Sequence, residues 1–287
     1  MNNINEIKTQ YQFDFFIKMY TFTANRLLES CGNAGERAVR NALQKYGAEL
    51  GESLRRQHLE QGIRTNLASL MASENCCGED PRFFRHTLKA TEQVQLWEVY
   101  GCPLARLWKQ MGADRAGMFY CEECVHSIVL AYTQGKGQAN LGERLTSERD
   151  SRCSFALYYR PANLDDEQRE QSFSSENSPL PSRQYVISDH FIKLYSRLFE
   201  EAGSQLGTAG INAIAAGLRD LAANAADSMS IESRHTDLAP DLSFLDSFFP
   251  IHMDADQDPL WEILGADNAR RLLEINLIHP LKLAMNL

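Results

Sequence analysis

Residues 13–35, FDFFIKMYTFTANRLLESCGNAG, begin a pattern that decides much of the fold of this 287-residue chain. Apolar side chains recur every three or four positions, which predicts an amphipathic helix, until CGNAG interrupts the pattern. Residues 36–57 resume the same spacing, so the two stretches predict a helical hairpin. The apolar positions are Phe13, Phe16, Ile17, Tyr20, Ala24, Leu27 and Leu28, then Val39, Leu43, Tyr46, Leu50 and Leu54.

The first hairpin has a counterpart later in the chain. FIKMY at 16–20 returns as FIKLY at 191–195, an offset of 175 residues. The same offset places two glycines and a leucine on identical residues, and these pairs are Gly32 with Gly207, Gly35 with Gly210, and Leu43 with Leu218. The match favours duplication of a hairpin, with convergence of two helical hairpins as the alternative. A duplicated hairpin predicts either a monomeric pseudo-dimer or a homo-oligomer.

Strands are predicted between the hairpins. Residues 83–99 alternate loosely, and Pro103 suits the first turn of a helix. Residues 138–147 and 152–161 predict two further strands joined by a polar turn. The expected fold class is therefore α+β, with a helical hairpin packed on a small antiparallel sheet with further helices, followed by a second mostly helical region.

Composition divides the chain into three ranges. Residues 1–160 hold the first hairpin and the strands, and 186–287 hold a helical region whose hairpin resembles residues 13–57. Between them, 161–185 are rich in Ser, Glu and Pro and predict a polar linker or loop.

Charge and cysteine usage exclude several classes. A formal charge of −9 without a basic cluster argues against nucleic acid as a partner. Because no apolar run approaches the roughly 20 residues of a membrane span and the first residues lack signal-peptide character, we expect a cytoplasmic protein without a membrane partner. Seven cysteines, including the pair Cys76-Cys77, fit reduced thiols better than a disulfide framework.

Chemically reactive residues gather in FYCEECVHSIVLAY at 119–132. The pattern predicts a helix whose first turn carries the polar groups, where backbone N–H groups stabilise a thiolate. Cys121 is then the candidate nucleophile, with His126 as base and Glu123 as the group that orients it. The alternative is that Cys121 and Cys124 are small core residues.

The same residues also permit a metal site. Cys121 and Cys124 form half of a zinc pattern, which Cys102 and Cys153 would complete if the fold gathers them. Zinc or another divalent metal is therefore a candidate cofactor under this alternative. Elsewhere, DADQDP at 254–259 resembles the start of a calcium loop, but proline stands where that loop requires glycine.

The order of these segments resembles the L-2-amino-thiazoline-4-carboxylic acid hydrolase family. The matching motifs are GCPLARLWKQMG at 101–112, FYCEEC at 119–124 and RCSFALYY at 152–159, and the resemblance covers residues 13–160. It implies a small-molecule substrate and hydrolytic opening of a cyclic amidine that contains sulfur.

The resemblance also implies residue roles. Cys121 would attack the ring, and His126 or Glu123 would move the proton. Arg144 would bind a substrate carboxylate, and Cys153 and Cys102 would line or assist the site.

Two departures from the family pattern leave alternatives open. Cys124 stands where members usually have Asp, and a charged residue near Arg149 replaces a usual Gly. The first departure favours a protein that binds a metal or small ligand, or catalyses a different reaction, through Cys102, Cys121, Cys124 and Cys153. A helical interaction protein with cysteines in its core is a third hypothesis.

Overall fold

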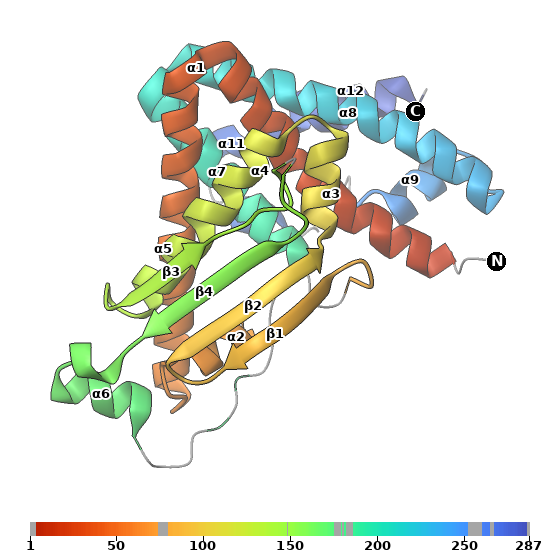
Figure 1. The fold of residues 1–287 in the computed structure, drawn as a ribbon. Helices are drawn as coiled ribbons and strands as arrows, with labels where there is room; N and C mark the ends of the chain where they lie inside the picture. Colours follow the sequence, from red (N-terminus) through yellow and green to blue (C-terminus); the bar gives the residue numbers. More distant parts are fainter. Residues whose placement is uncertain are drawn as a thin grey trace. The chain divides into compact units, whose positions relative to one another are not determined.

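The computed structural model describes residues 4–73, 80–147, 149–174, 179, 181, 186–251, 260–264 and 267–285. The fold is α+β, many helices with one four-stranded antiparallel sheet, as the sequence predicts (Figure 1). Its residues form two compact units, one made of Met1–Ala42 with Ile187–Leu287 and the other of Leu43–Val186. These units do not coincide with the ranges 1–160 and 186–287 expected from composition, because the first arm of the first hairpin packs with the C-terminal helices.

The unit Leu43–Val186 contains the sheet. Its strand order is β1-β2-β4-β3, and each neighbouring pair is antiparallel. The helix α1 (Ile4–Glu60) holds both arms of the first hairpin, and its second arm lies mostly in this unit. The unit's other elements are α2 (Leu67–Ser73), β1 (Phe84–Ala90), β2 (Val94–Gly101), α3 (Pro103–Gln110), α4 (Asp114–Phe119), the π-helical turn η1 (Tyr120–Cys124), α5 (Val125–Tyr132), β3 (Gly137–Leu141), β4 (Cys153–Tyr159), the 3-10 turn η2 (Pro161–Asn163) and α6 (Asp166–Phe173).

Two sequence predictions change in this unit. Residues 83–99 contain parts of two strands, β1 and β2, because a turn at 91–93 divides the stretch. The first part of the expected linker at 161–185 is helical and contains η2 and α6. Asp165 caps α6, because its side chain accepts a hydrogen bond from the backbone N–H of Gln168 at 2.8 Å. Part of that range lies outside the described residues.

In the other unit, every regular element among the described residues is a helix. This unit combines the first arm of α1 (Ile4–Glu60) with α7 (Ile187–Leu206), α8 (Thr208–Thr236), α9 (Leu242–Phe248), α10 (Leu260–Leu264), α11 (Asp267–Leu273), the π-helical turn η3 (Glu274–Ile278) and α12 (His279–Ala284).

Both hairpins break at the glycines that the repeat aligns. Gly32 has φ 53° and ψ −131°, and Gly207 has φ 57° and ψ −137°, a conformation that glycine adopts at little cost. Three residues later, a Cβ on Gly35 would lie 2.0 Å from the carbonyl oxygen of Leu27, and one on Gly210 would lie 2.5 Å from that of Ala202. Since 27 and 202 also differ by 175, the two breaks share their local packing as well as their backbone geometry.

Candidate functional site

A small cavity in the unit Leu43–Val186 gathers side chains from the sheet and from helices around α5. We call it the cysteine cavity; its volume is about 110 Å³. One wall is formed by Trp97 of β2 and Phe155 of β4, which are paired across the strands and stack with ring centroids 4.9 Å apart. Four cysteines line it, namely Cys102, Cys121, Cys124 and Cys153.

The topology explains how cysteines distant in sequence meet. Cys153 pairs with Val99 in the β2–β4 ladder, and β2 ends two residues later, so Cys102 follows directly as the N-cap of α3. Cys121 and Cys124 come from the π-helical turn that precedes α5. A π-helical turn inside a helix is a feature often found at functional sites.

Cys153 is held as a neutral thiol. Burial raises the pKa of Cys153 to about 11, although the backbone N–H of Leu145 donates to its sulfur at 3.1 Å and partly opposes that effect. Cys102 raises the pKa of Cys153 further, while Arg144 lowers it. Because a thiol is a poor nucleophile and a raised pKa also makes it a weaker acid, Cys153 forms a neutral part of the cavity wall.

Arg144 brings a cation to the cavity wall. Its guanidinium forms an ion pair with Glu122 and donates to the sulfur of Met118 at 3.5 Å. Its Nε is buried and has no hydrogen-bond partner among the described residues. A buried donor without an acceptor is costly, so the position is suited to a ligand oxygen or anion.

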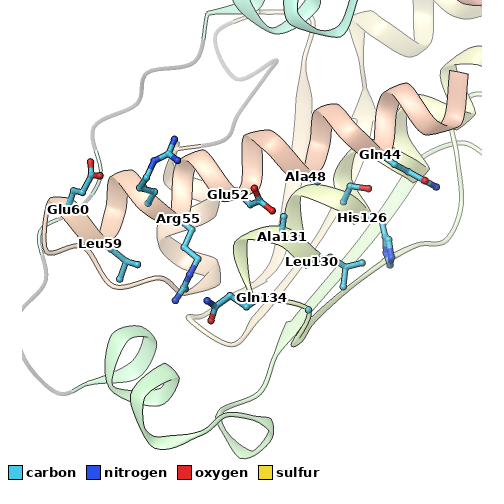
Figure 2. Close-up of a pocket in the computed structure, with 13 residues that line it drawn as sticks. Gln44, Ala48, Glu52, Arg55, Leu59, Glu60, His126, Leu130, Ala131 and Gln134 are labelled. Atoms are coloured by element: carbon cyan, nitrogen blue, oxygen red, sulfur yellow. The ribbon is translucent and has the colours of Figure 1, made fainter. Parts of the chain in front are cut away.

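Glu123 and His126 lie elsewhere. Glu123 accepts a hydrogen bond from Gln44 Nε2 at 2.7 Å, and His126 lines a separate open groove of about 900 Å³ between α1 and α5 (Figure 2). We call this space the α1–α5 groove; Glu52 also lines it. The predicted constellation of Cys121, Glu123 and His126 is thus divided between two spaces.

Helix geometry accounts for this division. The residues of the segment that line the cavity are Tyr120, Cys121, Cys124, Val125 and Ile128, which recur at three- and four-residue spacing. His126, Ser127, Leu130 and Ala131 line the groove instead. Cys121 also lies inside a continuous helical stretch that begins at Asp114, not in a first helical turn as expected. The backbone N–H groups that have no partner within the helix lie in its first turn, so they are not available to stabilise a Cys121 thiolate.

The metal interpretation finds no support among the described residues, where no group of three or more His, Cys, Asp or Glu side chains is arranged to hold a metal ion. The four cysteines share a cavity but do not form such a set. Cys76, Cys77 and the motif at 254–259 lie outside the described residues.

Sequence reasoning missed the close contact between α1 and α5. A Cβ on Gly47 would lie 2.8 Å from the carbonyl oxygen of Cys124, and one on Gly51 would lie 2.4 Å from that of Ile128. The two glycines are one helical turn apart, so the chain backbones approach along a shared face. Their four-residue spacing in KYGAELGES was the available signal.

Comparison of the chain with protein-family models, with curated proteins and with solved structures gives no match. Within the described part of the chain, no helix has both the length and the apolar character that crossing a bilayer requires.

Proposed function

We propose that this protein is a hydrolase for a small heterocycle that contains sulfur and nitrogen, of the 2-aminothiazoline-carboxylate type, and that the reaction takes place in the cysteine cavity. The observation that carries the proposal is that Cys102, Cys121, Cys153 and Arg144, from three separate sequence motifs and a loop, line one cavity. Three of these are the positions that carry the family resemblance.

In the proposed reaction, the Cys121 sulfur adds to the ring carbon between sulfur and nitrogen. The ring carbon–sulfur bond then breaks, and the ring sulfur leaves as a thiol by taking the proton that the Cys121 thiol gave up. Water subsequently displaces the Cys121 sulfur, which completes the addition of one water molecule and releases an N-carbamoyl product.

The remaining cavity residues suit the other requirements of this reaction. Arg144 would bind the substrate carboxylate through its buried Nε. Cys153, which stays protonated, would line the pocket as a neutral thiol. Cys102 would line the pocket. Glu123, which is bonded to Gln44, and His126, which lines the α1–α5 groove, were expected from the sequence to move the proton. Neither lines the cysteine cavity, so they have no role in this scheme.

A second candidate is binding of a small ligand without turnover, or with a different reaction. It is favoured by Cys124, a buried thiol in the cavity wall at the position where the family usually has a carboxylate. Loss of that carboxylate removes an acid or base while leaving the apolar cavity intact.

The shared geometry of the two hairpins supports a third proposal, that the chain is a monomeric pseudo-dimer. Light scattering on the purified protein tests it, since a stable homodimer would contradict the idea that one chain supplies both hairpins.

Mass spectrometry of purified protein incubated with 2-aminothiazoline-4-carboxylate tests the main proposal. We expect ring opening by the wild type, none by Cys121→Ala, and normal turnover by Cys31→Ala, because Cys31 belongs to the other unit. Tight binding without turnover would favour the second candidate, and absence of both would reject the site.

A further inference from the structure

A second cavity lies in the helical unit, apart from the site proposed above. It measures about 630 Å³ and lies between the first arm of α1 and the last turns of α8. Its α1 residues follow helical spacing along one face. We call it the Lys18 cleft; its polar wall includes Tyr11, Asp14, Lys18, Ser228, Glu232 and His235.

Tyr11 lines this cleft, and its hydroxyl is buried. Its ring packs edge-on against Phe248, with centroids 6.4 Å apart, while its oxygen has no hydrogen-bond partner among the described residues. Burial, and secondarily Glu232, raise the pKa of Tyr11, so the phenol stays neutral and can both donate and accept. A buried hydroxyl without a partner in a polar cavity indicates that a bound group supplies one.

Lys18 gives the cleft a cation beside two carboxylates. Burial lowers the pKa of Lys18, whereas Asp14 and Glu232 raise it. Glu232 is also 3.4 Å from His235 Nδ1. Charges of both signs therefore face the same space.

This arrangement restricts the ligand. A simple anion would pair with Lys18 but be repelled by Asp14 and Glu232, and a simple cation would meet the opposite conflict. A zwitterion satisfies both signs at once.

We infer that the Lys18 cleft binds a free amino acid, with its carboxylate on Lys18 and the Tyr11 hydroxyl and its ammonium group on Glu232 and Asp14. The inference does not depend on the proposed hydrolase activity.

The internal repeat offers a matched comparison within the chain. Asp14 and Lys18 correspond to Asp189 and Lys193 at the 175-residue offset, but Tyr11 corresponds to Val186, which has no hydroxyl. Lys193 is exposed, whereas Lys18 is half-buried. Lys193 therefore matches Lys18 in the repeat but lacks the neighbouring phenol. This makes Lys193 a suitable control position.

Isothermal titration of the full-length protein with each protein amino acid in turn tests the inference. We expect at least one amino acid to bind. Two analogues of that amino acid, one without the carboxylate and one without the ammonium group, should bind far more weakly. Tyr11→Phe should weaken binding about tenfold through loss of one hydrogen bond. Lys18→Met and Glu232→Gln should weaken it by more than about tenfold, because each removes a charged partner.

The control Lys193→Met should change the affinity by less than about twofold, as an exposed substitution does. Tyr11→Phe should also raise the Tm of the unliganded protein, because it removes a buried hydroxyl that lacks a partner. The inference fails if no amino acid binds, if the amine or carboxylate alone binds as tightly, or if folded Lys18→Met and Tyr11→Phe retain wild-type affinity.

Discussion

The cysteine cavity and the α1–α5 groove share one helical segment but differ in nearly every property that matters for chemistry. The groove is larger, about 900 Å³ against about 110 Å³, and it is open, with His126 and Glu52 on its walls (Figure 2). The cavity is small and has stacked aromatic rings, four thiols and a buried arginine nitrogen without a described partner. Size alone would select the groove, whereas the convergence of reactive groups selects the cavity.

The largest expected effect separates the two spaces directly. Cys121→Ala should lower the turnover of 2-aminothiazoline-4-carboxylate by at least about a hundredfold, because it removes the proposed nucleophile. Steady-state kinetics by mass spectrometry provide the measurement. Cys31→Ala is the control, and turnover that survives the Cys121 change would place the chemistry outside the cavity.

The second effect concerns substrate binding in the cavity. Arg144→Lys keeps a positive charge but loses the planar donor fork, so KM should rise about tenfold while kcat changes less. Initial-rate kinetics over a range of substrate concentrations separate the two constants. Arg149→Lys, an exposed change, should leave both unchanged, and an unaltered KM in Arg144→Lys would remove the carboxylate role.

A third test addresses the helix contact that both spaces share. Gly51→Ala should destabilise the protein by about 1–3 kcal/mol, because the new Cβ meets the carbonyl oxygen of Ile128 at 2.4 Å. Urea unfolding measures this change. Gly203→Ala is the matched control, since a Cβ there meets only the Ile211 side chain, at 3.4 Å, and a helical alanine should be neutral or stabilising.

A fourth test uses pH and a buried histidine next to the same helices. Burial lowers the pKa of His58, whose ring nitrogens lie 2.6 Å from the Tyr132 hydroxyl and 2.8 Å from that of Ser73. His58 therefore binds a proton more readily in the unfolded chain than in the folded protein. Its contribution to the free energy of unfolding is complete above about pH 6.5 and is lost as the pH falls below that value. Urea unfolding at several pH values should show a flatter acid dependence for His58→Gln, and an unchanged slope would contradict the assignment.

The smallest expected effects belong to two residues outside the cysteine cavity. His126→Ala and Glu123→Gln should each change turnover by less than about twofold, because exposed changes away from a site rarely cost more. The same kinetic assay measures both. A tenfold loss in either variant would return proton transfer to the residues expected from the sequence and would contradict a reaction confined to the cysteine cavity.

The sequence predicted the elements better than their assembly. Period-3.6 spacing and aligned glycines identified both hairpins, and Gly32 and Gly207 share their conformation because each copy makes the same break. The turn that separates β1 from β2 was missed because the alternation in 83–99 is weak. The division of the units was also missed, because nothing local to residues 4–42 shows that they pack with the C-terminal helices.

For the site, the sequence located the thiols but not their surroundings. The resemblance grouped Cys102, Cys121 and Cys153, which do share a cavity. It could not show that Glu123 and His126 lie outside that cavity, because proximity in sequence says little about which helix face packs against a sheet. The partner of Arg144, Glu122, was likewise visible only in three dimensions.

Protection of individual cysteines from alkylation tests the central claim most directly. Purified protein is treated with iodoacetamide with and without 2-aminothiazoline-4-carboxylate, and the modified peptides are quantified by mass spectrometry. The account predicts that the compound protects Cys121 and Cys102 and leaves labelling of Cys31 unchanged. Equal labelling of Cys121 and Cys102 with and without the compound would contradict the assignment of the cysteine cavity as the substrate site.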